Sequence, residues 1–370
     1  MQNETGRAGK TVMTALGPIA PEELGFTSMH EHVMFQGAVL ARRMREMIPA
    51  GHGLPIDADD KVSLENVGLL LNNSIMAWDA LVQDDEDVMA GEVQDFKDAG
   101  GGAIVEVSVP GIQLATAPMR NISRRTGVHI VVSTGFYTWD SWPEEFRGLG
   151  VREYKRHMEG EIRHGVQGTD IRPGSLKIAL EDLNEMEENA LRAAAQLCGE
   201  TGLPLTIHPC LKPGADQIQV IRILREEGVD LGRVVFAHTP VVSRPGLFRD
   251  LIDNPGLVKV TTELALRIMD EGANCSIEFE NPLGFEMMGR YNLGDLWKTS
   301  GICKIIEAGY SGQLVLGNDC CGRTMLRRGG ALGYLRLMGY GLTTLRDVAG
   351  VPESAIRRIT VENPARILAH

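Results

Sequence analysis

The sequence predicts an α/β protein with a single domain over residues 1–370, folded as a (β/α)8 TIM barrel with long insertions in the loops of its C-terminal face. A chain of 370 residues suits one large barrel, because such barrels run to roughly 200–400 residues as one domain. Eight short apolar runs alternate with helical patterns, as the barrel requires. A doubly wound open sheet is the alternative, but no predicted strand leads into a GxGxxG or GxxxxGK loop.

The predicted strands are short runs rich in Val and Ile, without a regular alternation of apolar and polar residues. Such runs are typical of parallel strands that are buried on both faces. A short N-terminal β segment at about 10–22 precedes all of them. The eight barrel strands are predicted at 24–29, 103–109, 129–134, 175–179, 203–207, 233–237, 257–261 and 313–316.

The segments between the strands carry the start and stop signals of helices. Asn184 can cap a helix, and Glu187 follows it three residues later, as in a capping box. Gly202 fits the end of the same helix. Another helical pattern at 89–99 runs into three consecutive glycines. Both patterns lie between predicted strands, which supports the strand–helix alternation.

Three segments are longer than ordinary connections. They span about 35–88, 140–167 and 264–298, and they follow the first, third and seventh predicted strands. Long strand-to-helix loops of a barrel lie at its C-terminal face and usually build the active site. The connections that lead into the strands are short and Gly-rich. This asymmetry places the chemistry at the C-terminal ends of the strands.

Composition limits the partners and the compartment. The net charge of −12 disfavours nucleic acid and anionic membranes. No stretch approaches the roughly 18 apolar residues of a membrane helix, and the first residues lack the apolar core of a signal peptide. The six cysteines form no CxxC pair, so we expect reduced thiols. We expect a cytoplasmic homodimer with a small-molecule substrate and with no nucleic-acid or membrane partner.

Potential metal ligands stand at the ends of the predicted strands. Lys177 precedes His208 by 31 residues, and His208 precedes His238 by 30, which is close to the length of one βα unit. These three residues should therefore lie at equivalent heights on neighbouring strands. The whole set comprises His30 and His32, which share one face of the first strand, Lys177 on the fourth, His208 and His238 at the ends of the fifth and sixth, and Asp319 after the eighth.

Four imidazoles and a carboxylate at one barrel mouth fit Zn²⁺ or a similar divalent ion, with hydrogen-bonded core histidines as the alternative. Lys177 is the unusual member, because an unpaired ammonium inside a barrel costs several kcal/mol. A neutral amine that adds CO2 becomes an anionic, bidentate carbamate, which could bridge two cations. An ion-paired or snorkelling lysine is the alternative for Lys177.

These residues lie within longer stretches that resemble the phosphotriesterase family of the amidohydrolase superfamily. Residues 11–33, TVMTALGPIAPEELGFTSMHEHV, resemble the N-terminal signature of the family. The ordered set HxH, Lys, His, His, Asp is specific, whereas HxH alone is weak. The resemblance covers almost the whole chain and continues through 101–107, 176–177, 206–208, 237–239, 317–319 and 363–366.

The resemblance implies a metal-dependent hydrolase barrel with two divalent ions, zinc first and manganese, cobalt or iron as alternatives. In such a centre a hydroxide bridges the two ions and attacks the substrate, and the aspartate accepts the proton of this nucleophile. In this chain His30, His32 and Asp319 would hold the buried ion, His208 and His238 the more exposed one, and carboxylated Lys177 would bridge both.

The predicted function is therefore hydrolysis of a small neutral ester, lactone or amide by a binuclear metal centre, with Asp319 as the catalytic residue. A hydrolase of organophosphate triesters, of the aryldialkylphosphatase type, is the nearest alternative. A catalytically silent barrel that only binds a ligand is an alternative of another class. Cys320 and Cys321 adjoin Asp319 and are interpreted as packing groups.

Substrate-binding residues are predicted from the same resemblance. Tyr137 matches the aromatic residue that lies over the metals in lactonases of the family, and Trp139 follows it. The chain departs from the family pattern in three places, and in two of them no acid follows His238 in 239–242 and no Gly-Arg-Asp follows the second strand. After the predicted seventh strand, Glu263 stands near the place of a lactonase arginine. A carboxylate there would disfavour anionic substrates, and a solvated surface glutamate is the alternative.

Overall fold

The computed structural model describes residues 9–45, 53–71, 73–209, 217–243, 248–279 and 294–370. Its centre is one sheet of eight strands, and every ladder between neighbouring strands is parallel. The order of strands along the sheet follows the chain, as the sequence predicts for a (β/α)8 barrel. The strands are β3 (Phe26–Glu31), β6 (Gly101–Glu106), β7 (His129–Phe136), β8 (Ser175–Ala179), β9 (Leu205–His208), β10 (Val234–Phe236), β13 (Asn274–Glu278) and β14 (Leu314–Gly317).

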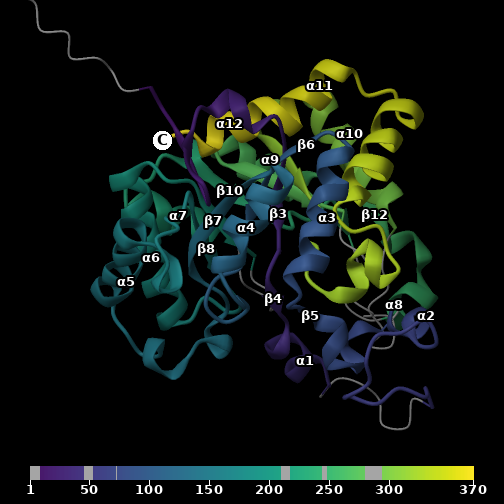
Figure 1. Cartoon of the computed structure of the whole chain (residues 1–370). Coiled ribbons are helices and arrows are strands. Elements are labelled where there is room, and N and C mark those ends of the chain that lie inside the picture. Colours follow the sequence, from purple (N-terminus) through teal and green to yellow (C-terminus); the bar gives the residue numbers. More distant parts are fainter. Residues whose placement is uncertain (1–8, 46–52, 72, 210–216, 244–247, 280–293) are drawn as a thin grey trace, which may run out of the picture.

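The sheet curls until its first and last strands, β3 and β14, meet. The Asp319 N–H donates to the carbonyl of His30 at 2.9 Å across this junction, which we call the seam. Helices surround the sheet (Figure 1). They are α3 (Glu86–Asp98), α4 (Ala117–Thr126), α5 (Val151–His164), α6 (Glu185–Thr201), α7 (Gln217–Glu226), α9 (Glu263–Asp270), α10 (Asp295–Glu307), α11 (Glu353–Arg357) and α12 (Asn363–Leu368).

The caps of α6 bear out the helix that the sequence predicts at this position. The Asn184 side chain accepts hydrogen bonds from the N–H groups of Met186 and Glu187, and Gly202 ends the helix in the left-handed conformation. The Glu187 side chain, however, turns away from the capping box. It accepts the N–H groups of residues 181–183 instead, so that it ties the connection after β8 to the start of α6.

The apolar core has two large clusters and smaller ones. The largest lies between the strands from β7 onwards and their helices, and it includes Phe136, Trp142 and Phe279. The second packs α3 and α4 against β6 and β7 and includes Phe96, Ile104 and Ile122. A smaller cluster joins valines of β6, β7, β10 and β14 to Val12 and Leu24, near the N-terminal ends of the strands. The C-terminal ends of the strands are therefore left to polar side chains.

The seventh predicted strand is wrong. The run at 257–261 supplies only β12 (Lys259–Val260), which pairs antiparallel with β11 (Val242–Ser243) outside the barrel, where Lys259 is exposed. The seventh barrel strand is β13, whose sequence NCSIE is mostly polar. Its polar side chains find partners within the barrel. Asn274, for example, donates to the carbonyls of Gly232 and Val234 at 3.0 and 2.9 Å.

The three long segments also contain more structure than a loop. Residues 140–167 include α5, and residues 264–298 include most of α9, all of β13 and the start of α10. Residues 35–88 form β4 (Phe35–Gln36), β5 (Val82–Gln83), α1 (Ala38–Arg45) and α2 (Val67–Leu70), which lie at the lower end of the barrel in Figure 1. The remaining elements are α8 (Phe248–Asp253) and three π-helical stretches at Arg336–Gly341, Thr344–Val348 and Arg358–Glu362.

At the opposite end, the N-terminal β segment is a hairpin of β1 (Val12–Thr14) and β2 (Gly17–Ile19). The Ala15 N–H donates to the carbonyl of Ile130 at 2.8 Å, which fixes the hairpin at the N-terminal end of β7. Within the described residues, no helix is long and apolar enough to cross a membrane. The five described cysteines are free thiols, and Cys210 lies outside the described residues.

Candidate metal centre

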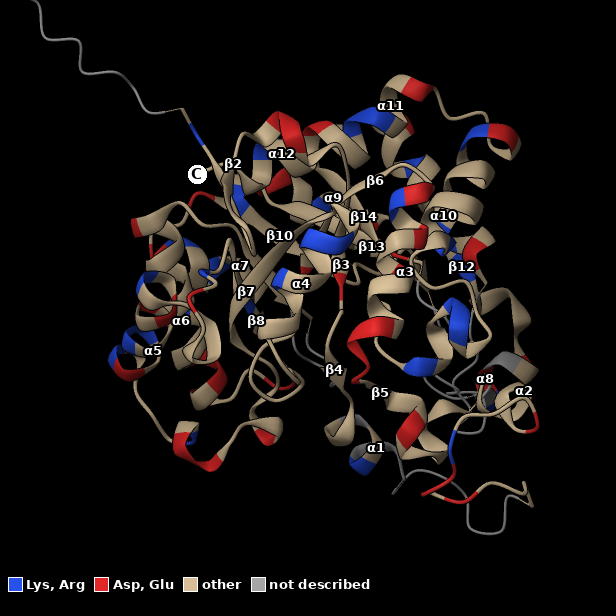
Figure 2. Cartoon of the chain, in the orientation of Figure 1, with Lys and Arg blue, Asp and Glu red and all other residues tan. Residues whose placement is uncertain are grey.

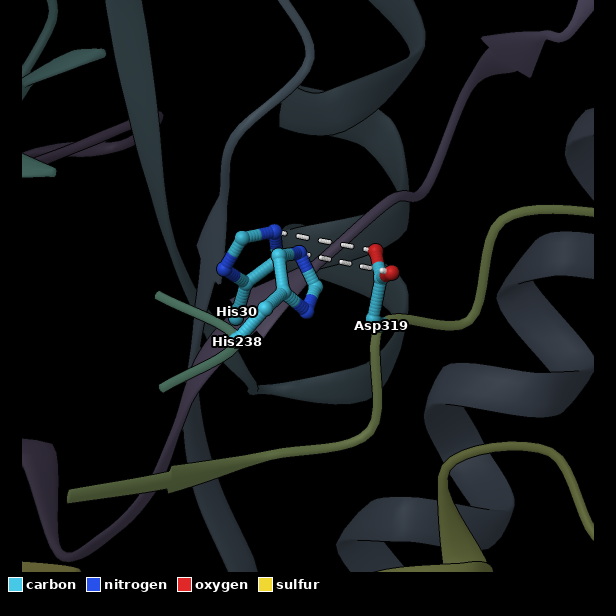
Figure 3. A group of neighbouring side chains, drawn as sticks. All are labelled: His30, His238 and Asp319. Carbon is cyan, nitrogen blue, oxygen red and sulfur yellow. Dashed lines mark ion pairs between the residues drawn. The ribbon is translucent and has the colours of Figure 1, made fainter. Parts of the chain in front are cut away.

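Three of the predicted ligands converge at the C-terminal end of the barrel. His30, His238 and Asp319 each offer a ligand atom, and these atoms lie within 4.8 Å of one another. Figure 3 shows the Asp319 carboxylate facing both imidazoles. Its Oδ1 lies 3.6 Å from Nε2 of His30 and 3.1 Å from Nε2 of His32, and its Oδ2 lies 3.7 Å from Nε2 of His238. The aspartate therefore stands at the centre of three histidines.

Lys177 reaches the same place from β8. Its side chain is 1% exposed, and its Nζ lies 3.4 Å from Nε2 of His30. Burial lowers the pKa of the Lys177 amine to about 8, although the charges of Asp319 and Glu278 act in the opposite direction. A neutral amine is therefore accessible near neutral pH, and a neutral amine is the form that can add CO2.

His208 completes the set on the side of β9 and β10. Its ring centroid lies 4.8 Å from that of His238 and 5.4 Å from that of Tyr137. Burial and the charge of His238 lower the pKa of His208 well below its usual value, and burial does the same for His30, together with the charge of Lys177. Both rings are therefore neutral at pH 7 and carry a free lone pair, as a metal ligand requires.

Two of the predicted ligands have an unusual backbone. His238 has φ = +48° and Asp319 has φ = +53°, and only two other non-glycine residues of the described chain have a positive φ. Such conformations cost of order 1–3 kcal/mol each and cluster at functional sites, where the surroundings enforce them. Here the enforcing groups are two buried carboxylates, one on each side of the barrel mouth.

The first carboxylate is Glu278, the last residue of β13. Its Oε2 accepts the His238 N–H at 2.8 Å and lies 3.2 Å from Nδ1 of the same residue, while its Oε1 lies 3.6 Å from Nδ1 of His30. A carboxylate on the second nitrogen of a ligand histidine fixes the tautomer and orients the ring. Burial raises the pKa of Glu278, but His238 and the Ser276 hydroxyl outweigh it, so the group is ionised. Glu278 is not among the residues predicted from the sequence, because the seventh strand was expected at 257–261 and lies at Asn274–Glu278.

The second is the carboxyl group of Glu31, which stands between the two histidines of HxH and is fully buried, so that its pKa is raised to about 8. Its oxygens accept the N–H groups of Asn318 and Cys320 at 3.0 and 3.1 Å, on both sides of Asp319. The Asn318 amide donates to Glu31 as well, at 2.6 Å, and the Tyr334 hydroxyl donates to the carbonyl of His32 at 2.7 Å. Side chains therefore close the seam at the point where His30, His32 and Asp319 lie.

The residues present fit divalent ions. His208 Nε2 is buried, and no hydrogen bond joins it to another described residue, which is costly for a polar atom unless a ligand takes its lone pair. His32 has its other nitrogen, Nδ1, 2.7 Å from the Ser108 hydroxyl, which leaves Nε2 for the site. Four imidazoles, the carboxylate of Asp319 and a buried amine together form a donor set that divalent ions accept.

The other residues predicted from the sequence differ from one another in their surroundings. Tyr137 is buried beside His208. Trp139 is half-buried and packs against the largest apolar cluster, and its backbone N–H donates to Glu187 Oε1 at 3.3 Å. Glu263 is exposed at the start of α9, which precedes the true seventh strand, and its role in substrate binding stays a prediction. Cys320 and Cys321 are buried in the second apolar cluster, as expected for packing groups.

Comparisons with known proteins agree with this picture. The family model "Phosphotriesterase family" matches residues 10–368. An N-acetyltaurine hydrolase of Tetraodon nigroviridis is 27% identical over 374 residues, which cover 98% of each chain. A resiniferatoxin-binding protein of Rhodobacter sphaeroides has the same fold with a TM-score of 0.82, at 27% identity and with coverage of 98% of this chain and 95% of that one. A lactonase of Listeria monocytogenes, at 20% identity, shares the fold with a TM-score of 0.72 and coverage of 97% and 98%.

The barrel and its ring of histidines thus define a metal-dependent hydrolase. Within that class, this chain belongs to the phosphotriesterase family.

Proposed function

We propose that this hydrolase cleaves a small neutral ester, lactone or amide, and that small N-acyl amides are the substrates to test first. The observation that carries the proposal is the convergence of His30, His238 and Asp319 at the C-terminal end of the barrel, with Lys177 beside them. No serine or cysteine nucleophile is required, because such a site activates water.

Two divalent ions would be held by six side chains of the barrel mouth. When bound, they would polarise the substrate oxygen and lower the pKa of water to near neutrality. Zinc fits the imidazole-rich set best, and manganese, cobalt or iron are alternatives. The proposed ligands are His30, His32 and Asp319 for the buried ion, His208 and His238 for the other, and the carbamate of Lys177 between them.

Asp319 is the base in this proposal. Burial raises the pKa of its carboxyl, but His238 and the hydrogen bond with His32 outweigh this effect and hold the pKa well below its usual value. The ionised carboxylate accepts a proton as water attacks the carbonyl carbon, and it returns that proton to the departing nitrogen or oxygen. Tyr137, buried against His208, is proposed to contact the substrate oxygen.

The choice of substrate rests on the relatives and on the exposed position of Glu263. Several relatives with coverage of 96–98% of this chain are named N-acetyltaurine hydrolase, which points to an amide bond. Glu263 lies on the surface layer, so it gives no reason to exclude acyl amides that carry a negative charge. Tests should therefore include both neutral and anionic N-acyl amines.

The proposal is tested with the metal-loaded full chain and a substrate panel. The panel contains N-acetyl amides of small amines and amino acids, γ- and δ-lactones, p-nitrophenyl esters and paraoxon. We expect hydrolysis of a carboxylic acid derivative, with the highest kcat/KM for an N-acyl amide. Paraoxon as the best substrate would favour the triester alternative, and failure on the whole panel with both metals bound would favour a silent binding barrel.

A further inference from the structure

A pocket lies at the end of the barrel opposite the candidate metal centre. It has a volume of about 340 Å³, and it is bounded by the β1–β2 hairpin, by one face of α4 and by residues 170–172, just before β8. The hairpin is fixed at the N-terminal end of β7 through Ala15. The pocket therefore lies at the N-terminal ends of β7 and β8, whereas the proposed metal ligands lie along or just beyond the C-terminal parts of their strands.

The lining of this pocket is strongly basic. It contains Arg120, Arg124 and Arg172 and a single acid, Asp170, so its formal charge is 3 − 1 = +2. The whole chain carries a net charge of −12. Over the outer helices, acidic and basic residues are otherwise interspersed (Figure 2). A concentration of positive charge in a cavity of an acidic protein indicates an anionic ligand.

One arginine of the lining is held in place, whereas the other two, Arg124 and Arg172, are exposed. Arg120 is anchored, since its Nε donates to the carbonyl of Ala15 at 3.2 Å and its Nη1 to Asp170 at 2.7 Å. Arg124 lies one turn further along α4, where a like charge at i, i+4 destabilises the helix. In the described part of the chain, no acid forms an ion pair with Arg124 or Arg172. The adjacent Arg125, by contrast, pairs with Asp87 at 2.7 Å.

We propose that this pocket binds a small organic phosphate or phosphonate. A dianion would neutralise the charge of +2, and guanidinium groups match the geometry of phosphoryl oxygens. The remaining lining residues are Thr14 and five apolar or small ones, which include Met13, Leu16 and Ile171. The volume is at the lower end of the range for small-molecule pockets, roughly 300–1,000 Å³, which leaves room for a short organic group beside the phosphoryl group.

Binding at this place would connect three parts of the chain. The hairpin, α4 and the segment before β8 are separate in sequence, and Arg120 already joins two of them through Ala15 and Asp170. A ligand that contacts Arg124 and Arg172 at the same time would tie α4 to the segment before β8 a second time. Because it binds only the folded state, such a ligand raises the unfolding temperature.

The probe is butylphosphonate, which phosphatases cannot hydrolyse, with inorganic phosphate, butyrate and butanol for comparison. Binding to the metal-loaded full chain is measured by calorimetry and by thermal unfolding at constant ionic strength. The test variant is Arg124→Ala/Arg172→Ala, in which both residues are exposed, and the control is Arg152→Ala/Arg163→Ala, which removes two exposed charges from α5. Crystals soaked in selenate and analysed by anomalous scattering show where an oxyanion lies.

We expect butylphosphonate to bind more tightly than phosphate, and butyrate and butanol to bind at least tenfold more weakly. In the test variant, butylphosphonate should bind at least tenfold more weakly and should no longer raise the unfolding temperature. The control variant should bind it as the native chain does, and both variants should keep the native hydrolytic activity. Equal affinity in test and control variants, or selenate only at the metal centre, would overturn the proposal. Tighter binding of phosphate than of butylphosphonate would contradict the proposal that the ligand carries an organic group.

Discussion

The two sides of the barrel mouth are built in different ways. On one side, β8, β9 and β10 carry Lys177, His208 and His238, and continuous parallel ladders fix their relative positions. On the other side, β3 and β14 carry His30, His32 and Asp319, and these strands share no regular ladder in the sheet order. There the buried side chains of Glu31, Asn318 and Tyr334 close the seam. Backbone ladders are insensitive to single substitutions, whereas a seam closed by side chains depends on a few residues.

The largest effect is expected for Lys177→Ala on the ladder side. β8 keeps its ladders to β7 and β9, so the fold should survive, but the bridging group is lost. Metal content and nearly all activity should disappear, and a short carboxylic acid with bicarbonate should restore part of both. Metal analysis, kcat and ¹³C NMR of protein equilibrated with labelled CO2 check this. Lys61→Ala, at a side chain that is 81% exposed, is the control. Two tightly bound metals in Lys177→Ala would contradict the carbamate.

Asp319→Asn is the matching change at the seam. The amide keeps an oxygen ligand but loses the charge and the basicity, so much of the metal should remain. kcat should fall about 10²–10⁴-fold, the usual range for a lost general base. Cys320→Ala and Cys321→Ala, measured beside it, should retain the chemistry. A native rate in Asp319→Asn, together with inactivity of a cysteine variant, would point to a thiol nucleophile.

Glu278→Gln tests whether the ladder side needs its buried carboxylate to orient His238. The amide has no charge and only one accepting oxygen. If that oxygen keeps the N–H and the ring of His238, the amino group faces the Ser276 hydroxyl and Nδ1 of His30, so the group no longer orients both rings. Metal affinity should fall about 10–100-fold, as for other carboxylates that hold a ligand histidine. Competition with a chelator measures the affinity. An unchanged metal affinity would mean that the ladders alone orient His238.

Glu31→Gln tests the side chains that close the seam. One accepting oxygen is replaced by an amino group, which leaves a buried N–H beside Asp319 without an acceptor. The cost in unfolding free energy should be about 1–3 kcal/mol, measured by urea unfolding of the metal-free chain. After reconstitution the buried ion should be lost before the exposed one, so metal analysis should find close to one ion per chain. Loss of both ions together would show that the two sides are not independent.

The smallest effect is expected for Glu263→Gln. This residue is exposed at the start of α9, so kcat/KM should change less than twofold for neutral and anionic substrates alike. A selective gain in kcat/KM for anionic substrates would indicate that Glu263 lines the substrate pocket, as its place in the sequence predicts.

Local patterns predicted most of the barrel. Seven of the eight strand positions overlap the strands observed, because runs of branched apolar residues favour a strand wherever they lie. The run at 257–261 has the same pattern, yet it lies on the surface with β11. The polar sequence NCSIE does not look like a barrel strand until its partners are known. Those partners, such as the carbonyl of Gly232 for Asn274, lie about 40 residues away.

The order and the approximate spacing of the six proposed metal ligands follow from the chain itself, because each lies on or just beyond a strand of a repeating strand–helix unit. Their heights differ, since Lys177 is in register with Thr206, two residues before His208. Glu278 and Glu31 could not be assigned in this way. Each is a single carboxylate without a spacing pattern, and Glu31 meets the N–H of Cys320 only because the barrel closes across 289 residues. Closure brings the first and last strands together and buries these carboxylates beside the ligands. A buried carboxylate must find hydrogen-bond donors, and only the closed barrel decides which donors are within reach.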